Sequence, residues 1–349
     1  MISRRRFTQV FAAGVAATSL AACSSNAPAA PAGAATPDPR AGSDLRAGAG
    51  EHTSLGPIKH VDAGVVSMAY AEFGPATGQP VLLLHGWPYD GHSYVDVAPL
   101  LAAAGYRVLV PFLRGYGATT FLSPRTVRNG QQSAVALDVV AFMDALKIDK
   151  AVLGGFDWGA RTVDVIAALW PQRCKAIVAV SGYIITNLEA SQQPLSPVAE
   201  LGWWYQYYFA TERGRAGYRA NRRDFNRLIW KNASPRWDFD EATYDRSAAA
   251  FDNPDHVDIV VHNYRWRLSL AAGEPRYDEY ERKLATGPAI SVPAITIGSD
   301  FDAGAKDGMA YRGKFTGKYV HRIFDGIGHN VPQEAPRPFA QAIIDADHL

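Results

Sequence analysis

The feature that most constrains the fold is an alternation of short apolar runs with amphipathic segments. Seven runs are bounded by turn residues, at 65–74, 80–86, 106–113, 151–156, 176–182, 293–300 and 319–326. Their nearly continuous hydrophobicity is typical of strands that are buried on both faces of a sheet. Patterns typical of helices lie between the runs, at 96–104, 133–146, 160–169 and 336–346. We therefore predict an α/β fold with a mostly parallel central sheet flanked by helices.

The alternation stops between residues 184 and 286. No run typical of a buried strand lies there, and the segment is rich in Trp, Tyr and Arg, as in "GWWYQYYFATERGRAGYRANRRDFNRLIWK". This composition predicts an inserted helical cap over the carboxyl edge of the sheet, where ligands bind in open α/β sheets. The folded part is thereby divided into a first core segment at 53–183, the cap at 184–286 and a second core segment at 287–349.

The N-terminus has the pattern of an export signal. Residues 1–23 combine a basic start, an apolar stretch at about 10–20 and a run of small residues. The "SRRRF" sequence at 3–7 resembles a twin-arginine signal, and the Leu-Ala-Ala-Cys sequence that ends at Cys23 resembles a lipobox. We expect an exported bacterial protein, periplasmic or at the cell surface, that touches the membrane only through a lipid on Cys23; the alternative is an ordinary signal peptide cleaved after an Ala-x-Ala site. Residues 24–52 are mostly Ala, Pro, Gly and Ser, which predicts a flexible linker.

Composition excludes several classes of partner. The formal net charge is +1, and no long basic run exists outside the N-terminus, which argues against nucleic acid as the main partner. The sequence has no metal-ligand spacing such as Cys-x-x-Cys or His-Glu-x-x-His. We expect neither a metal nor an organic cofactor, because side chains and water can carry out every step of the chemistry considered below. If Cys23 is lipidated, Cys174 is unpaired, and we expect it to be a buried packing residue. Nothing in the sequence indicates an oligomeric state.

The sequence "GFDWG" at 155–159 links a predicted strand to a predicted helix. Glycines on both sides allow a tight, strained turn, which points the middle side chain into a pocket. Asp157 is therefore a candidate nucleophile, although an aspartate here could also be an ordinary helix N-cap. The amide of Trp158, at the positive end of the helix, is a candidate donor to an oxyanion.

Four motifs together resemble the aspartate-nucleophile branch of the α/β-hydrolase superfamily, which includes the epoxide hydrolases and the haloalkane and fluoroacetate dehalogenases. They are "LHGWP" at 84–88, "GFDWG" at 155–159, "ITIGSDFDAG" at 295–304 and "GIGHNVPQEAP" at 326–336. The resemblance extends over residues 55–349. Epoxide hydrolases usually have His where this chain has Phe156.

The resemblance implies a role for each motif. Asp157 would attack an sp³ carbon and form an alkyl ester, which water activated by His329 would hydrolyse. The backbone amide of Trp87 would be the second oxyanion donor. The catalytic acid that orients the histidine follows a core strand, and both Asp300 and Asp302 fit; we favour Asp300 because it is nearer the strand end. His329 could instead be a surface histidine before a turn.

Two tyrosines of the predicted cap distinguish epoxide hydrolysis from dehalogenation. Epoxide opening creates an alkoxide, a poor leaving group that needs acidic donors. Tyr205 in "WYQYYF" and Tyr264 in "HNYRWR" resemble the two tyrosines that supply these donors in epoxide hydrolases. Both could instead line an apolar pocket, and Tyr183, Tyr207 and Tyr208 are the fallback candidates.

The dehalogenase alternative rests on two other residues. Trp158 follows the nucleophile, as in haloalkane dehalogenases, but Trp87 stands where those enzymes usually have Asn or Glu. Arg161 matches one of the two arginines of fluoroacetate dehalogenases, and we expect it to be a structural ion-pair partner. The leading prediction is a hydrolase that opens a small apolar epoxide, aromatic or aliphatic, to a vicinal diol. The alternatives are a dehalogenase, an ester or lactone hydrolase, and a lipoprotein that only binds a hydrophobic ligand.

Overall fold

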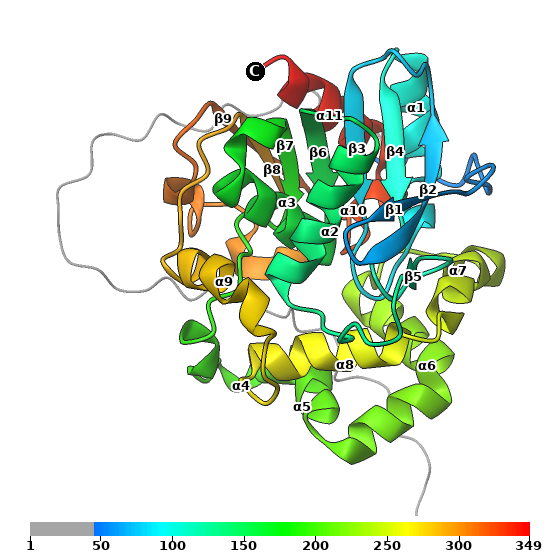
Figure 1. The fold of residues 1–349 in the computed structure, drawn as a ribbon. Coiled ribbons are helices and arrows are strands. Elements are labelled where there is room, and N and C mark those ends of the chain that lie inside the picture. The colour runs from blue at the N-terminus through cyan, green and yellow to red at the C-terminus, as the bar shows by residue number, and fades with distance from the viewer. Residues whose placement is uncertain (1–44) are drawn as a thin grey trace, which may run out of the picture.

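The computed structural model describes residues 45–349, which form one mixed sheet with helices on both faces (Figure 1). The strands are β1 (Lys59–Ala63), β2 (Val66–Phe73), β3 (Pro80–Leu84), β4 (Arg107–Pro111), β5 (Thr120–Phe121), β6 (Ala151–Gly155), β7 (Cys174–Val180), β8 (Ala294–Ser299) and β9 (Tyr319–Phe324). Their order is β1-β2-β4-β3-β6-β7-β8-β9, with β5 paired to β2. All pairings from β4 through β9 are parallel, and those made by β2 are antiparallel. The predicted signal, Cys23 and most of the predicted linker lie outside the described residues.

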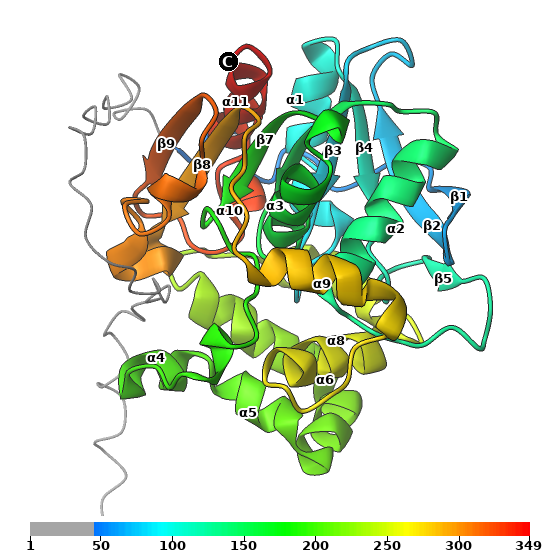
Figure 2. The same ribbon diagram turned by 60° about the vertical axis from the view of Figure 1, so that its left-hand side comes forward.

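Besides short 3₁₀ helices, the described chain has eleven α-helices: α1 (Val97–Ala103), α2 (Gln132–Ala145), α3 (Trp158–Leu169), α4 (Pro197–Gly202), α5 (Trp204–Ala210), α6 (Glu212–Ala233), α7 (Glu241–Ala248), α8 (His256–Arg267), α9 (Asp278–Ala285), α10 (Val331–Glu334) and α11 (Pro336–Asp347). Helices α2 and α3 pack together on one face of the sheet, and α1 and α11 pack together on the other (Figures 1 and 2). This arrangement confirms the predicted fold class.

Each of the seven predicted strand runs overlaps one strand of the sheet, and only β7 begins before its run, at Cys174; β1 and β5 were not predicted. The reason is burial. Strand β6 is buried at every position, as its continuous apolar sequence requires. Strand β1 lies at the edge of the sheet, pairs only with β2, and leaves Lys59, His60 and Asp62 exposed, so it has no apolar run.

The segment between β7 and β8 contains the six helices α4–α9 and no strand, as the cap prediction requires. Its longest helix, α6, begins after Thr211, whose Oγ1 accepts a hydrogen bond from the Gly214 amide at 2.9 Å. Helices α5, α6 and α8 pack on one another at the carboxyl end of the sheet (Figure 2). Helix α9, by contrast, packs against α3 of the core.

An aromatic cluster holds the cap helices together. The ring of Phe209 in α5 lies 4.9 and 5.4 Å, between centroids, from Tyr218 and Phe225 of α6. It lies 5.4 Å from the ring of Tyr264 in α8. Such ring pairs contribute about 0.5–1.5 kcal/mol each beyond the area that they bury. The aromatic side chains of the segment therefore form the core of the cap.

One further sequence expectation concerns the cysteine of the described part of the chain. Cys174 is a free, buried thiol, as predicted. No helix within residues 45–349 combines the length and apolarity needed to cross a bilayer. The same residues contain no group of three or more His, Cys, Asp or Glu side chains placed to hold a metal ion.

Candidate active site

Asp157 lies on a strained turn between β6 and α3. Its backbone has φ 52° and ψ −123°, a conformation that residues with a side chain rarely adopt. The flanking glycines make this turn sterically feasible. A Cβ on Gly159 would lie 1.8 Å from the Leu84 carbonyl oxygen, and a Cβ on Gly155 would lie 2.5 Å from the carbonyl carbon of Gly159. The Gly-x-Asp-x-Gly spacing is thus a packing requirement of this strand-to-helix turn at 155–159, which we call the elbow.

The Asp157 carboxylate is held by groups from two other segments. Its Oδ1 accepts a hydrogen bond from the Trp87 amide at 2.8 Å, and its Oδ2 lies 3.5 Å from Nε2 of His329. Gly86 allows this approach, because a Cβ there would lie 2.3 Å from the Asp157 Cβ. The exposed fraction of the Asp157 side chain is 17%, so the side chain is largely but not completely buried.

Burial alone would raise the pKa of the Asp157 carboxyl. The interaction with His329, the charge of Arg161 and the Trp87 amide outweigh burial and lower this pKa below its ordinary value. The carboxylate is therefore ionised at neutral pH and available as a nucleophile.

Two backbone amides are placed as oxyanion donors. The amide of Trp87 already contacts Oδ1 of Asp157. Trp158 is the first residue of α3, where amides have no partner within the helix and the helix dipole favours negative charge. Both predicted oxyanion residues therefore flank the candidate nucleophile.

The loop that carries His329 is fixed by a buried polar network that the sequence did not reveal. The His329 amide donates to Ser234 Oγ at 2.9 Å, and that hydroxyl donates to Glu334 at 2.7 Å. The fully buried Glu334 also accepts from the Gly328 amide at 3.0 Å and pairs with Arg46 at 3.3 Å. Ser234 follows α6 of the cap, so this network joins the cap, the loop and the start of the described chain.

The structure does not bring Asp300 to His329. Strand β8 ends at Ser299, and the following 3₁₀ turn (Asp300–Ala305) directs the Asp300 carboxylate outward, where its side chain is 30% exposed. It accepts from the Gly326 amide at 3.1 Å and pairs with Arg236 at 3.2 Å and Lys306 at 3.4 Å. These contacts are those of a surface ion pair.

Asp302 has the opposite environment. It is buried, and its Oδ2 accepts from the Ser299 amide at 2.9 Å. Burial raises the pKa of its carboxyl, while interactions with Ser181 and His329, among others, act in the lowering direction. The Nδ1 atom of His329 is buried and makes no hydrogen bond within the described residues. Asp302 therefore fits the position of the histidine's acid partner better than Asp300.

Tyr205 and Tyr264 lie together above the elbow. Their ring centroids are 5.3 Å apart, and they lie 5.0 and 5.1 Å from the Trp87 ring. Burial raises the pKa of both phenols, and the Asp157 charge raises it further. Both hydroxyls are therefore protonated at neutral pH and can donate.

The three fallback tyrosines make contacts away from Asp157. The Tyr183 hydroxyl donates to the Pro288 carbonyl at 2.9 Å. Tyr207 is half-exposed and bonds Glu200 at the surface. Tyr208 stacks on the Phe225 ring within the cap. None of these contacts places a fallback tyrosine beside Asp157.

Arg161 does not make the ion pair that was expected. Its Nε donates to the Ile184 carbonyl at 3.2 Å, and no carboxylate of the described residues lies within 4.0 Å of its guanidinium. The residue is only 7% exposed, so its charge is buried beside this turn, where it acts on the Asp157 carboxylate without a direct ion pair.

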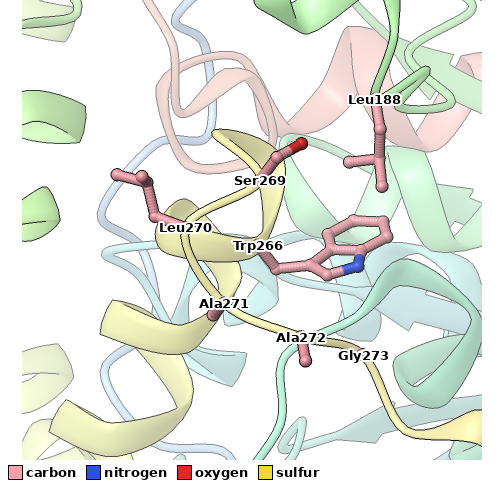
Figure 3. A pocket seen from close by; sticks show the side chains of 7 residues that line it. All are labelled: Leu188, Trp266, Ser269, Leu270, Ala271, Ala272 and Gly273. Carbon is pink, nitrogen blue, oxygen red and sulfur yellow. The ribbon is translucent and has the colours of Figure 1, made fainter.

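A hollow of about 410 Å³ lies where α8 ends. Figure 3 shows two of its lining residues, Trp266 and Leu188, facing each other. Residues 269–273 complete its lining. The hollow includes neither Asp157 nor the cap tyrosines, so it is separate from the elbow.

Comparisons with known proteins identify the family of the chain. A model of the alpha/beta hydrolase fold family matches residues 79–222. The chain is 26% identical over 313 residues to epoxide hydrolase A of Mycobacterium tuberculosis, a match that spans 82% of this chain and 95% of that protein. A crystal structure from Klebsiella pneumoniae, described as a candidate epoxide hydrolase, is 56% identical with a TM-score of 0.83, over 84% of this chain and 98% of that one. The epoxide hydrolase of Vigna radiata, at 23% identity and a TM-score of 0.65 over 84% of this chain and 98% of that one, shares the fold.

The chain therefore belongs to the α/β-hydrolase family and is an enzyme of that family. Within it, the chain is epoxide hydrolase-like.

Proposed function

We propose that this enzyme opens an epoxide to a vicinal diol through a covalent ester on Asp157. The observation that carries the proposal is the pairing of Tyr205 and Tyr264, two buried and protonated phenols, above an ionised carboxylate. Opening a strained C–O bond requires a nucleophile that attacks the carbon and a proton donor on the side of the oxygen.

The first step uses the free carboxylate oxygen. Because Oδ1 of Asp157 is bound to the Trp87 amide, Oδ2 is the atom that attacks the epoxide carbon. The carbon–oxygen bond of the ring breaks as the new ester bond forms. The ring oxygen takes a proton from Tyr205 or Tyr264, which leaves an alcohol and a tyrosinate.

The second step hydrolyses the ester. His329 takes a proton from water, and the resulting hydroxide adds to the ester carbonyl carbon. The negative charge that develops on Oδ1 is stabilised by the amides of Trp87 and Trp158. When the intermediate collapses, its hydroxyl proton passes to the leaving alkoxide, and the proton on His329 returns to the tyrosinate. Asp302 would hold the ring of His329 and stabilise its cation.

The tyrosine pair gives the test that is specific to epoxides. The double variant Tyr205→Phe with Tyr264→Phe should lower kcat/KM for styrene oxide by about 10²-fold or more, because the alkoxide loses its proton donors. The rate is measured as diol formed. The matched control is Tyr207→Phe, which removes an exposed hydroxyl from α5, the helix that also carries Tyr205. A double variant as active as the parent protein would rule out the tyrosines as donors.

Dehalogenation is a second candidate, favoured by one observation. The Nε1 of Trp158 is a buried donor with no hydrogen-bond partner among the described residues, and a weak N–H donor suits a halide leaving group. Chloride release from 1-chlorohexane that exceeds diol formation from styrene oxide would favour this candidate. Activity on esters or lactones alone would favour the third alternative.

We further propose that the protein is exported and lipid-anchored at Cys23. The support is sequence alone: the basic start, the apolar stretch and the Leu-Ala-Ala-Cys pattern within residues 1–23. Recovery of the full-length chain in the cytoplasm of its host, unprocessed and without lipid, would contradict this proposal.

A further inference from the structure

Residues 45–55, which we call the strap, precede β1 and are held to the core at several points. The amides of Gly50 and His52 donate to the buried carboxylate of Asp96, both at 2.7 Å. Leu55 packs in the hydrophobic core. The strap lies ahead of all the motifs that supply the proposed catalytic residues, so those motifs do not explain why it is held so firmly.

Arg46 links the strap to the loop that carries His329. Its Nη2 donates to the Gly326 carbonyl at 2.7 Å and lies 3.3 Å from Oε2 of Glu334. The Arg46 side chain is 33% exposed, whereas the Glu334 side chain is completely buried. Within residues 45–349, no other Lys, Arg or His side chain forms an ion pair with Glu334. Arg46 is therefore the described counter-ion of a buried carboxylate.

The other contacts of Glu334 lead to the backbone of His329. Its Oε2, the oxygen beside Arg46, accepts from the Gly328 amide at 3.0 Å. Its Oε1 accepts from the Ser234 hydroxyl at 2.7 Å, and that hydroxyl accepts from the His329 amide at 2.9 Å. The packing is close, because a Cβ on Gly328 would lie 2.5 Å from Ser234 Oγ. Glu334 thus fixes two successive amides, and the second is that of His329.

The proposed reaction needs the position of His329 only in its second step. Its Nε2 lies 3.5 Å from Oδ2 of Asp157, and this nitrogen takes a proton from water after the ester has formed. In the first step Asp157 attacks and the cap tyrosines donate, without the histidine. A misplacement of about 1 Å can slow a catalytic step by roughly 10²-fold. A displaced loop would therefore slow hydrolysis of the ester and spare its formation.

Loss of the Arg46 charge would disturb this loop through Glu334. The carboxylate would be left buried without its counter-ion, so Oε2 would take up a proton or turn toward water. Either change weakens the hydrogen bond from the Gly328 amide, because a protonated or displaced oxygen is a poorer acceptor.

We infer that Arg46 is a positioning residue for ester hydrolysis, which acts through Glu334 on the loop that carries His329. Arg46 touches neither the nucleophile nor the base. Its role makes the strap a working part of the catalytic unit. The inference rests on the proposed function for its two kinetic steps and on the hydrogen bonds from Arg46 to His329 for the position of the base.

The kinetic test compares three single variants. Arg46→Gln removes the charge. Arg46→Lys restores it, and because both described contacts are made by one nitrogen, an ammonium group can replace them. The matched control is Arg337→Gln, which breaks the pair with Glu51 of the same strap, at 3.1 Å and half-exposed on both sides, without touching Glu334. Thermal midpoints verify folding.

Single-turnover kinetics with styrene oxide should separate the two steps. We expect Arg46→Gln to slow ester hydrolysis by about 10-fold or more and to change ester formation by less than about twofold. The covalent ester should therefore accumulate in this variant. Arg46→Lys and Arg337→Gln should hydrolyse the ester at close to the wild-type rate. Equal slowing of both steps in Arg46→Gln, or no slowing of either, would overturn the inference.

A double-mutant comparison keeps the test decisive if Arg46→Gln does not fold. Glu334→Gln removes the buried charge and with it the need for a counter-ion. Ester hydrolysis is then measured in Glu334→Gln with and without Arg46→Gln. Equal rates would support action through Glu334. A further loss of about 10-fold on adding Arg46→Gln would contradict it.

The position of His329 can also be measured without any reaction. In protein labelled with ¹³C-histidine, the imidazole signal of His329 is the one that is missing from His329→Gln. We expect that signal to shift in Arg46→Gln and to keep its place in Arg46→Lys and Arg337→Gln. An unshifted signal in Arg46→Gln would overturn the inference.

The two readouts separate the inference from the proposed function. If the wild-type protein forms no ester but the His329 signal shifts in Arg46→Gln alone, the positioning role stands and the proposed function fails. If the wild-type protein forms and hydrolyses the ester and Arg46→Gln behaves like Arg337→Gln, the positioning role is wrong and the proposed function stands.

Discussion

Replacing Asp157 by Asn should lower the turnover of styrene oxide by about 10⁴-fold or more. The carboxylate is the nucleophile of the first step, and an amide oxygen cannot displace an alkoxide from carbon at a useful rate. Asn is the suitable replacement because it keeps the volume and shape of the side chain on this strained turn, where φ is 52°. The measurement is diol formation, together with the intact mass of the variant to verify that the amide has not hydrolysed.

The fold of this variant should survive the change. The Trp87 amide can still donate to the Asn side-chain oxygen, so the thermal midpoint should stay close to that of the parent protein. A well-folded Asp157→Asn protein that retains more than about one tenth of the parent activity would place the nucleophile elsewhere.

Asp302→Asn should lower turnover by about 10²–10⁴-fold, because the imidazole of His329 would lose the charge that orients it and stabilises its cation. The matched control is Asp300→Asn, two residues away on the same turn. Asp300 is bound to Arg236 and Lys306 at the surface, and such pairs contribute about 0–1 kcal/mol to stability. Its loss should leave turnover almost unchanged.

The two variants are compared by single-turnover kinetics, which separate ester formation from ester hydrolysis. Asp302→Asn should slow hydrolysis more than formation, because only hydrolysis needs a charged histidine. The reverse ranking, with Asp300→Asn inactive and Asp302→Asn active, would restore the assignment that the sequence favoured.

The elbow could be predicted from sequence because its chemistry is local. The turn that exposes Asp157 needs glycines at fixed spacing and a strand before it, and all of these are neighbours in the chain. His329 could be predicted for a similar reason, since its motif follows the last strand run. In both cases the structure brings the side chains to the place that the linear order indicates, 3.5 Å apart.

The choice between Asp300 and Asp302 depended on information that linear order does not contain. Both follow β8 within three residues, and distance from the strand end favoured Asp300. The 3₁₀ turn gives the two carboxylates different surroundings, because it rotates successive side chains so that Asp300 is partly exposed and Asp302 is buried. No residue type in the segment signals that rotation.

Contacts between distant segments could not be predicted either. The Ser234–Glu334 hydrogen bond that holds the His329 loop joins residues 100 positions apart. The unpaired state of Arg161 became visible only once every neighbouring carboxylate had a position. In each case the physical signal is a buried polar group whose partners come from another element, and a single sequence does not specify which element that is.

The most direct test of the covalent mechanism is the intact mass of His329→Gln after reaction with styrene oxide. This variant keeps the nucleophile and the cap donors but lacks the base, so the ester should form and persist. The expected result is a mass gain equal to the whole epoxide, located on Asp157 by peptide mapping and absent from the double variant His329→Gln with Asp157→Asn. An unmodified His329→Gln protein that still releases diol, or an adduct on any other residue, would contradict the covalent mechanism.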